Sequence, residues 1–263
     1  MPFTPTPPVR AGAQAERALV LALTATVTVL PLAPASLARI ALAALGTATL
    51  AAMRWRAPAA TSVGLLGLAC ALLAAIGVGP SQVVLPVALA IHGCLVRAVP
   101  WLRAEAGWLT RGALSPPLVA AILGIAVVSG AALLGWHRAL HPDVADLVRD
   151  FVPDWPLGAL VLGASAFALW NAAIEEAVYR GVLQGALVRV LPPAPAIALQ
   201  ALAFGAIHLH GFPRGAVGVA LASVYGAMLG ALRHRGRGLL APWLAHVATD
   251  LVIASLLIRL ARG

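Results

Sequence analysis

The sequence predicts an all-α fold, a polytopic bundle of about eight to nine transmembrane helices. Of its 263 residues, 61% are hydrophobic and only 10% are charged, with a mean hydropathy of +0.94. This is more apolar surface than a soluble domain of the same length can bury. Proline, glycine and arginine also divide the chain into apolar runs of roughly 20 residues, the length that an α-helix needs to cross a membrane.

The expected spans follow one another with short connections. Residues 1–15 are rich in proline and are expected to be disordered, whereas residues 16–155 hold the N-terminal spans and an outer loop. That loop, at residues 137–155, fits a solvated connector better than a short interfacial amphipathic helix. Residues 156–258 hold the remaining spans. The nine expected spans are residues 18–35, 37–53, 59–79, 82–100, 116–136, 156–176, 196–212, 215–232 and 239–258.

The basic residues indicate a bacterial membrane protein and not a nucleic-acid-binding one. The formal net charge is +9 and all 18 basic residues are arginine, which together with abundant alanine, glycine and proline suggests a GC-rich bacterial genome. If the N-terminus is cytoplasmic, twelve of the 18 arginines fall in inside connections, in line with the positive-inside rule. We therefore expect a multi-pass protein of the bacterial inner membrane, with membrane lipids around it and no nucleic-acid partner.

A few ionisable side chains fall within or at the edge of predicted spans. The acids are Glu175, Glu176 and Asp250, and the histidines are His92, His208, His210 and His246. His210 is expected to be an interface residue and His92 a packed polar residue. An ionised group in hydrocarbon costs about 2.5–3.5 kcal/mol, so such residues usually face a protein interior or a water-filled cavity. A helix rises about 1.5 Å per residue, which places Glu175 about 7 Å, His208 about 18 Å and His246 about 10 Å from the cytoplasmic edge of the membrane. With a half-thickness of about 15 Å, they are expected to converge near the cytoplasmic half. Three separate spans would thus deliver one glutamate and two histidines to a common pocket.

This set of side chains suits the hydrolysis of an amide. A carboxylate can take a proton from water, while imidazoles hold that water and later supply a proton to the leaving amine. Glu175, His208 and His246 could instead hold Zn²⁺, because catalytic zinc sites often use two histidines, one glutamate and a water. The sequence contains no H-E-x-x-H motif. We therefore slightly favour a site that requires no metal and leave zinc open.

Three short motifs resemble those of a known family. The segment E-E-A-V-Y-R (Glu175 to Arg180) resembles E-E-x-x-x-R, and F-G-A-I-H (Phe204 to His208) resembles F-x-x-x-H. The segment H-V-A-T-D (His246 to Asp250) resembles H-x-x-x-N/D. In this order, each at a span, they resemble the CPBP family of intramembrane endopeptidases, which includes CaaX prenyl proteases and bacteriocin-processing or immunity-related proteins. The resemblance marks residues 156–258 as a CPBP-like catalytic core.

The resemblance implies a role for each motif residue. Glu175 resembles the glutamate that activates water, and His208 and His246 resemble the histidines that hold this water or stabilise the oxyanion. Many members have Asn where this chain has Asp250, so the oxyanion role of that position is in question. The residues expected to support the catalytic three are Glu176, Arg180, Phe204 and Asp250.

The expected activity is cleavage of a membrane-tethered protein or peptide near its terminus. The protease would be of the glutamic type, or a metalloprotease if a metal is bound. Two other interpretations fit the same polar residues: a transporter that relays protons or metal ions, and a non-catalytic immunity or scaffold protein of the same fold. A relay needs polar groups spaced through the membrane, whereas these gather at one depth, which favours the protease. The sequence leaves the substrate and the oligomeric state open.

Overall fold

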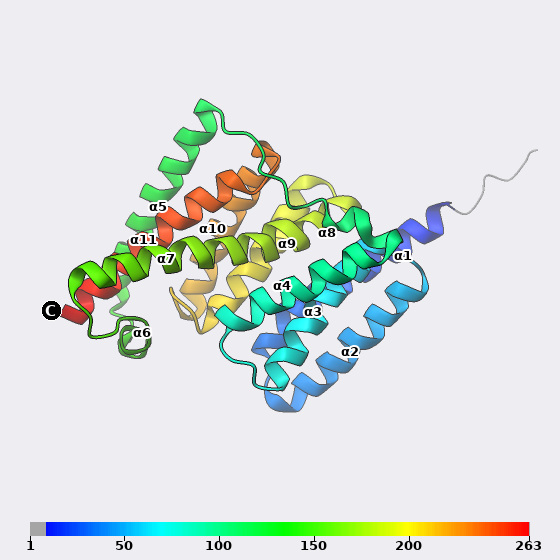
Figure 1. The fold of residues 1–263 in the computed structure, drawn as a ribbon, viewed down its shortest axis with the longest axis horizontal. Helices are drawn as coiled ribbons and strands as arrows, with labels where there is room; N and C mark the ends of the chain where they lie inside the picture. The colour runs from blue at the N-terminus through cyan, green and yellow to red at the C-terminus, as the bar shows by residue number, and fades with distance from the viewer. Residues whose placement is uncertain (1–8, 263) are drawn as a thin grey trace, which may run out of the picture. The chain divides into compact units, whose positions relative to one another are not determined.

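The structure, a computed structural model, describes residues 9–262, and every regular element among them is helical (Figure 1). Helix α1 begins at Val9, inside the segment expected to be disordered, and the other residues of that segment, 1–8, lie outside the described part. The helices are α1 (Val9–Val29), α2 (Ala35–Arg54), α3 (Pro58–Ala75), α4 (Ser81–Ala98), α5 (Pro116–Leu140), α6 (Ala145–Phe151), α7 (Leu157–Glu175), α8 (Gln184–Val190), α9 (Pro193–Ala206), α10 (Gly215–Gly236) and α11 (Leu240–Arg262).

Eight helical runs among the described residues are long and apolar enough to cross a membrane, which confirms the predicted fold class. The seventh expected span, 196–212, is instead a shorter apolar helix, Pro193–Leu209. Its α-helical part has 14 residues, a rise of about 21 Å against a hydrocarbon core of about 30 Å. Helices α7 and α8, by contrast, belong to one continuous run of 34 residues, Leu157–Val190.

The connection expected at residues 137–155 is more ordered than a solvated connector. Helix α5 continues to Leu140, and the short helix α6 follows it. Both terminal nitrogens of Arg214 donate to the carboxylate of Asp146 on α6, at 3.1 and 2.9 Å. These hydrogen bonds from the Arg214 guanidinium hold the pKa of Asp146 below its ordinary value.

The chain divides into two compact units. The first comprises residues 1–108 and 182–199, of which the described part holds α1 to α4 and α8. The second comprises residues 109–181 and 200–263. In the first unit, His92 is fully buried on α4, and its Nε2 lies 2.9 Å from the hydroxyl of Ser62 on α3. Every candidate site residue lies in the second unit.

The core of the second unit forms where α5, α10 and α11 pack together. Helix α7 packs along α11, which brings the glutamates at the end of α7 towards the histidine on α11. Gly226 of the G-A-M-L-G segment packs within the chain, since a Cβ there would lie 3.1 Å from Phe204 and 3.2 Å from the backbone of Ala201. The buried core residues are Leu118, Ile122, Leu229, Leu232, Ala241 and Ala245.

A close backbone crossing holds one end of this unit together. The extended segment before α5 runs across the turn between α10 and α11, and Ala113 N–H donates to the carbonyl of Gly236 at 3.0 Å. Gly112 has a φ of +75°, and a Cβ on it would collide with the backbone of Gly236 and Gly238. Glycine is therefore required at position 112 both by its backbone conformation and by the space available.

Candidate active site

The two adjacent glutamates lie at a change of helix type. Helix α7 ends at Glu175, and the next eight residues, Glu176–Leu183, form a π-helix. A π-helix bonds residue i to i+5, so its turns are wider than those of an α-helix, and such segments occur frequently at functional sites. The span expected at 156–176 thus continues further along the chain, and Arg180 lies inside this continuous helical run and is fully buried.

Glu176 forms the buried part of the site together with Arg180 and His246. Its Oε1 accepts a hydrogen bond from Arg180 Nη1 at 2.8 Å and lies 2.8 Å from His246 Nδ1. The three residues are 1%, 0% and 3% exposed. We call Glu176, Arg180 and Nδ1 of His246 the inner group. Both donors bind Oε1, so this oxygen is paired without access to water, whereas Oε2 of Glu176 is buried with no hydrogen-bond partner among the described residues.

Arg180 is fixed by further contacts with neighbouring helices. Its Nη2 donates to the carbonyl of Gly226 at 3.3 Å, and its Cζ lies 4.4 Å from the centre of the Phe204 ring. Its own carbonyl accepts a hydrogen bond from Arg233 Nε at 2.8 Å. This arrangement fits the supporting role expected for Arg180 and Phe204, because it holds the guanidinium against Glu176.

A second set of polar atoms surrounds the other nitrogen of the same imidazole. His246 Nε2 lies 3.7 Å from Glu175 Oε2 and 3.6 Å from Asp250 Oδ1. The side chains of Glu175 and Asp250 are 17% and 11% exposed, more than any member of the inner group. We call Glu175, Asp250 and Nε2 of His246 the outer group. The two glutamates thus differ in their environment: Glu176 is buried and paired, whereas Glu175 is partly exposed.

His208 is connected to this cluster by the ring of Phe204, which packs against it. Its Nδ1 is 3.0 Å from the carbonyl oxygen of Phe204, and because a carbonyl only accepts, Nδ1 carries the proton. The Nε2 of the neutral ring then has a lone pair with which it can accept a hydrogen bond. The ring of Phe204 lies 4.9 Å from that of His208 and 6.0 Å from that of His246, measured between centroids. Phe204 therefore lies against both histidines.

Sequence reasoning missed one polar residue of the site, Asn171. Its Nδ2 donates to Asp250 Oδ2 at 3.2 Å. Asn171 and Glu175 are four residues apart on α7, which places them on one face of that helix. This spacing could have drawn attention to Asn171. Its bond to Asp250 joins residues 79 positions apart, and no pattern in the sequence gives that pairing.

Two tyrosines also line the cluster. Tyr179 is buried, and its ring meets that of Phe204 edge to face at 5.1 Å. Tyr225 of α10 lies 5.7 Å from the His246 ring, measured between centroids, and its hydroxyl donates to the carbonyl of Ala245 at 3.4 Å. The rings of Tyr225 and Phe204 thus both pack edge to face against the imidazole of His246, which limits the positions it can take.

Within residues 9–262, no group of three or more His, Cys, Asp or Glu side chains is arranged to hold a metal ion. His246 Nδ1 is bonded to Glu176 and His208 Nδ1 to a backbone carbonyl, so each histidine presents Nε2. A metal-bound histidine commonly has its other ring nitrogen bonded in this way. Glu175, His208 and His246 are therefore the residues that would hold Zn²⁺, which would activate a water and polarise the substrate carbonyl.

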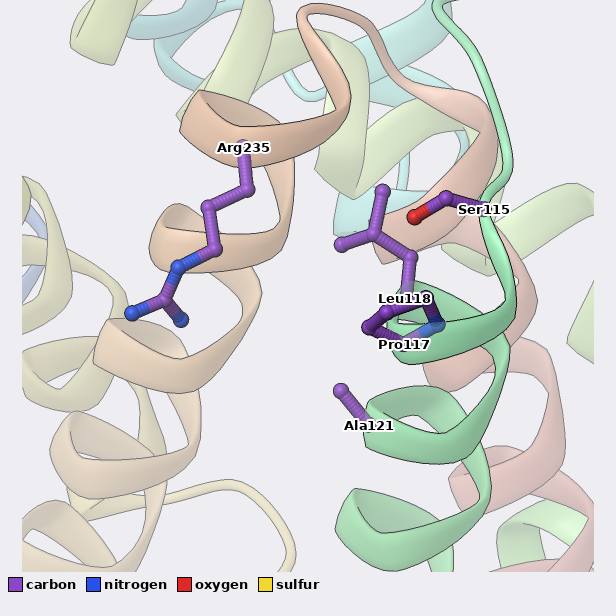
Figure 2. Close-up of a pocket in the computed structure, with 5 residues that line it drawn as sticks. All are labelled: Ser115, Pro117, Leu118, Ala121 and Arg235. Atoms are coloured by element: carbon purple, nitrogen blue, oxygen red, sulfur yellow. The ribbon is translucent and has the colours of Figure 1, made fainter.

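A pocket of about 300 Å³ lies elsewhere in the second unit (Figure 2). Figure 2 shows side chains from the start of α5 facing the part of α10 that carries Arg235. None of the candidate site residues lines this pocket. The residues that line it are Ser115, Pro117, Leu118, Ala121 and Arg235.

Comparison with known proteins supports the family resemblance that the three motifs indicate. A family model described as Type II CAAX prenyl endopeptidase Rce1-like matches residues 153–252. This range holds Asn171, both glutamates, both histidines and Asp250, and the match confirms the predicted family for this part of the chain. Searches of the curated proteins and of the solved structures gave no match.

Proposed function

Starting from the Rce1-like segment at residues 153–252, we propose that this multi-pass membrane protein is an intramembrane endopeptidase. It hydrolyses a peptide bond near the terminus of a membrane-tethered protein or peptide. The observation that carries the proposal is the unequal environment of the two glutamates around His246. Glu176 is buried and bonded to Nδ1, whereas Glu175 is accessible and lies 3.7 Å from Nε2.

Glu175 is the base in this mechanism. A water between Glu175 and the substrate carbonyl gives a proton to the carboxylate as its oxygen bonds to the carbonyl carbon. The electron pair of the C=O double bond moves to the oxygen, which becomes an oxyanion. When the tetrahedral intermediate collapses, the C=O bond re-forms and the C–N bond breaks. The proton held by Glu175 then passes to the leaving nitrogen, so that the carboxylate is regenerated.

The two histidines act around this centre. His208, with its proton on Nδ1 directed to Phe204, can accept a hydrogen bond from the attacking water at Nε2. His246 is fixed from the inner side by Glu176, to which Nδ1 donates. In this mechanism the ring is an imidazolium, as suits its place among three carboxylates, so that Nε2 also carries a proton and donates on the outer side, where the oxyanion forms. Hydrogen-bond donors that are held in place before the reaction stabilise developing charge most effectively. The role of the inner group is therefore to orient His246.

The remaining parts of the proposal concern the metal requirement, the membrane and the class of substrate. We propose that the enzyme needs no metal, acts in the bacterial inner membrane with its N-terminus in the cytoplasm, and takes a lipid- or membrane-tethered polypeptide and no nucleic acid. The residues 156–258 form its catalytic core, and the N-terminal spans contact the surrounding lipids. A transporter is less well supported, because Glu175, Glu176, His246 and Asp250 gather in one cluster and do not follow a path through the membrane.

The test compares membranes from cells that express the wild-type protein or the Glu175→Ala variant. A peptidase leaves at least one membrane protein with a terminal segment that stays uncut only in the variant, and quantitative proteomics of terminal peptides detects it. Asp154→Asn is the matched control, since Asp154 is an exposed acid outside the cluster. Identical terminal peptides in wild type and Glu175→Ala, at equal expression, would contradict the proposed activity.

A further inference from the structure

Asn171 lies between the two carboxylates of the outer group. It donates to Asp250 Oδ2 at 3.2 Å, and it precedes Glu175 by four residues on α7, within hydrogen-bonding reach of that carboxylate. No motif of the sequence includes it. Asn171 is thus the one uncharged polar side chain placed against both Glu175 and Asp250 among the described residues.

The outer group presents an electrostatic problem that Asn171 can solve. Glu175 Oε2 and Asp250 Oδ1 both lie within 3.7 Å of the same nitrogen, His246 Nε2, and two like charges so close in a partly buried place repel each other. Arg180, the nearest described cation, is already bonded to Glu176 and to the carbonyl of Gly226. A primary amide can donate two hydrogen bonds without adding charge.

We propose that Asn171 is a positioning residue of this site, which holds Asp250 apart from Glu175 and keeps both on opposite sides of His246 Nε2. This inference rests on the proposed peptidase function and adds a residue to it. With Asp250 fixed by Asn171, the carboxylate of Glu175 is left free to take the proton of the attacking water. Without Asn171, Asp250 moves towards the other available donor, Nε2 of His246, and removes that donor from the oxyanion.

The experiment uses the full chain in lipid nanodiscs. Its probes are a quenched-fluorescent prenylated CaaX peptide and the terminal segment that stays uncut in Glu175→Ala membranes. Asn171→Ala is expected to lower kcat about 10- to 100-fold with little change in KM, since it removes a hydrogen bond to a charged group. Asn171→Asp should lower kcat further, because it adds a third carboxylate to the two of the outer group, Glu175 and Asp250. The double variant Asn171→Asp/Asp250→Asn restores one amide and one carboxylate and should recover most of the kcat lost in Asn171→Asp.

Two controls separate positioning from folding. Ser165→Ala removes a hydroxyl on the same helix that bonds only to the carbonyl of Val161, and it should leave kcat unchanged. The thermal midpoint of each variant shows whether it is folded. Wild-type kcat in Asn171→Ala, or a double variant no more active than Asn171→Asp at an equal midpoint, overturns the inference alone. If wild type and Glu175→Ala do not differ on either probe, the proposed function fails and the inference fails with it.

Discussion

Glu176 holds His246 through a 2.8 Å contact between its Oε1 and the imidazole Nδ1, at a depth where neither side chain is accessible. The same oxygen accepts the hydrogen bond from Arg180. One carboxylate oxygen thus fixes both a cation and a candidate catalytic ring. The neighbouring Glu175 has a different environment, and the two adjacent acids should respond differently to the same substitution.

Replacing Glu176 should lower the stability of the folded protein, whereas replacing Glu175 should lower only its activity. In Glu176→Ala the fully buried Arg180 loses its anion, and breaking a buried pair in this way costs about 3–5 kcal/mol. In Glu175→Ala only an accessible base is lost, so the thermal midpoint should stay near that of wild type while the rate of cleavage falls about 10²- to 10⁴-fold. Thermal unfolding in detergent and cleavage assays on the same preparations measure both effects. Equal loss of stability in the two variants would contradict the distinction between inner and outer groups.

Substitutions of His208 can identify which of its nitrogens acts. An Asn side chain can supply a donor near Nδ1, and a Gln side chain reaches the position of Nε2. If Nε2 holds the water, His208→Gln should retain more cleavage than His208→Asn, and His208→Ala should have the least. Rates measured at saturating substrate give the order. A more active His208→Asn would indicate instead that the bond to the Phe204 carbonyl is what matters.

Gly226→Ala should destabilise the second unit. An added Cβ would press on the Phe204 ring at 3.1 Å and on the Ala201 backbone at 3.2 Å, and overpacking of this kind costs about 1–3 kcal/mol. Gly124→Ala on α5 is the matched control, since a Cβ there meets nothing within 4 Å. It should be neutral or slightly stabilising, as alanine is the better helix former. Thermal midpoints of both variants in one detergent check the contrast.

The contact between Asp146 and Arg214 should make stability depend on pH in a defined direction. The pKa of Asp146 is below its ordinary value of 3.8 because Arg214 donates to its ionised form. A depressed pKa in the folded state contributes stability above the unfolded value, and this contribution is lost as pH falls through the folded value. Asp146→Asn should therefore lower the thermal midpoint at pH 7 and have a smaller effect near pH 3. An equal effect at both pH values would show that the charge of Asp146 is not involved.

The sequence predicted the spans and the site residues because each leaves a local signal. Apolar runs give the helices, and intramembrane Glu175, His208 and His246 are visible as ionisable groups where few are tolerated. The partners of these groups are not local. That Glu176 and not Glu175 bonds His246 depends on the rotation of α7 against α11, and the pairing of Asn171 with Asp250 depends on the same packing. The short length of α9 also escaped prediction, since the apolar run there continues past the point where the helix ends.

The π-helical segment Glu176–Leu183 has a consequence for how the chain tolerates insertions and deletions. Deleting one residue such as Ala177 would move every following residue one step around the helix axis. The arginine would then be three residues after Glu176 and still on the same face, but it would be turned away from the carbonyl of Gly226 on α10 and the ring of Phe204 on α9. The spacing between the second glutamate and the arginine is therefore constrained by the contacts of the arginine with neighbouring helices as well as by its ion pair, although most of the surrounding helix is ordinary apolar sequence.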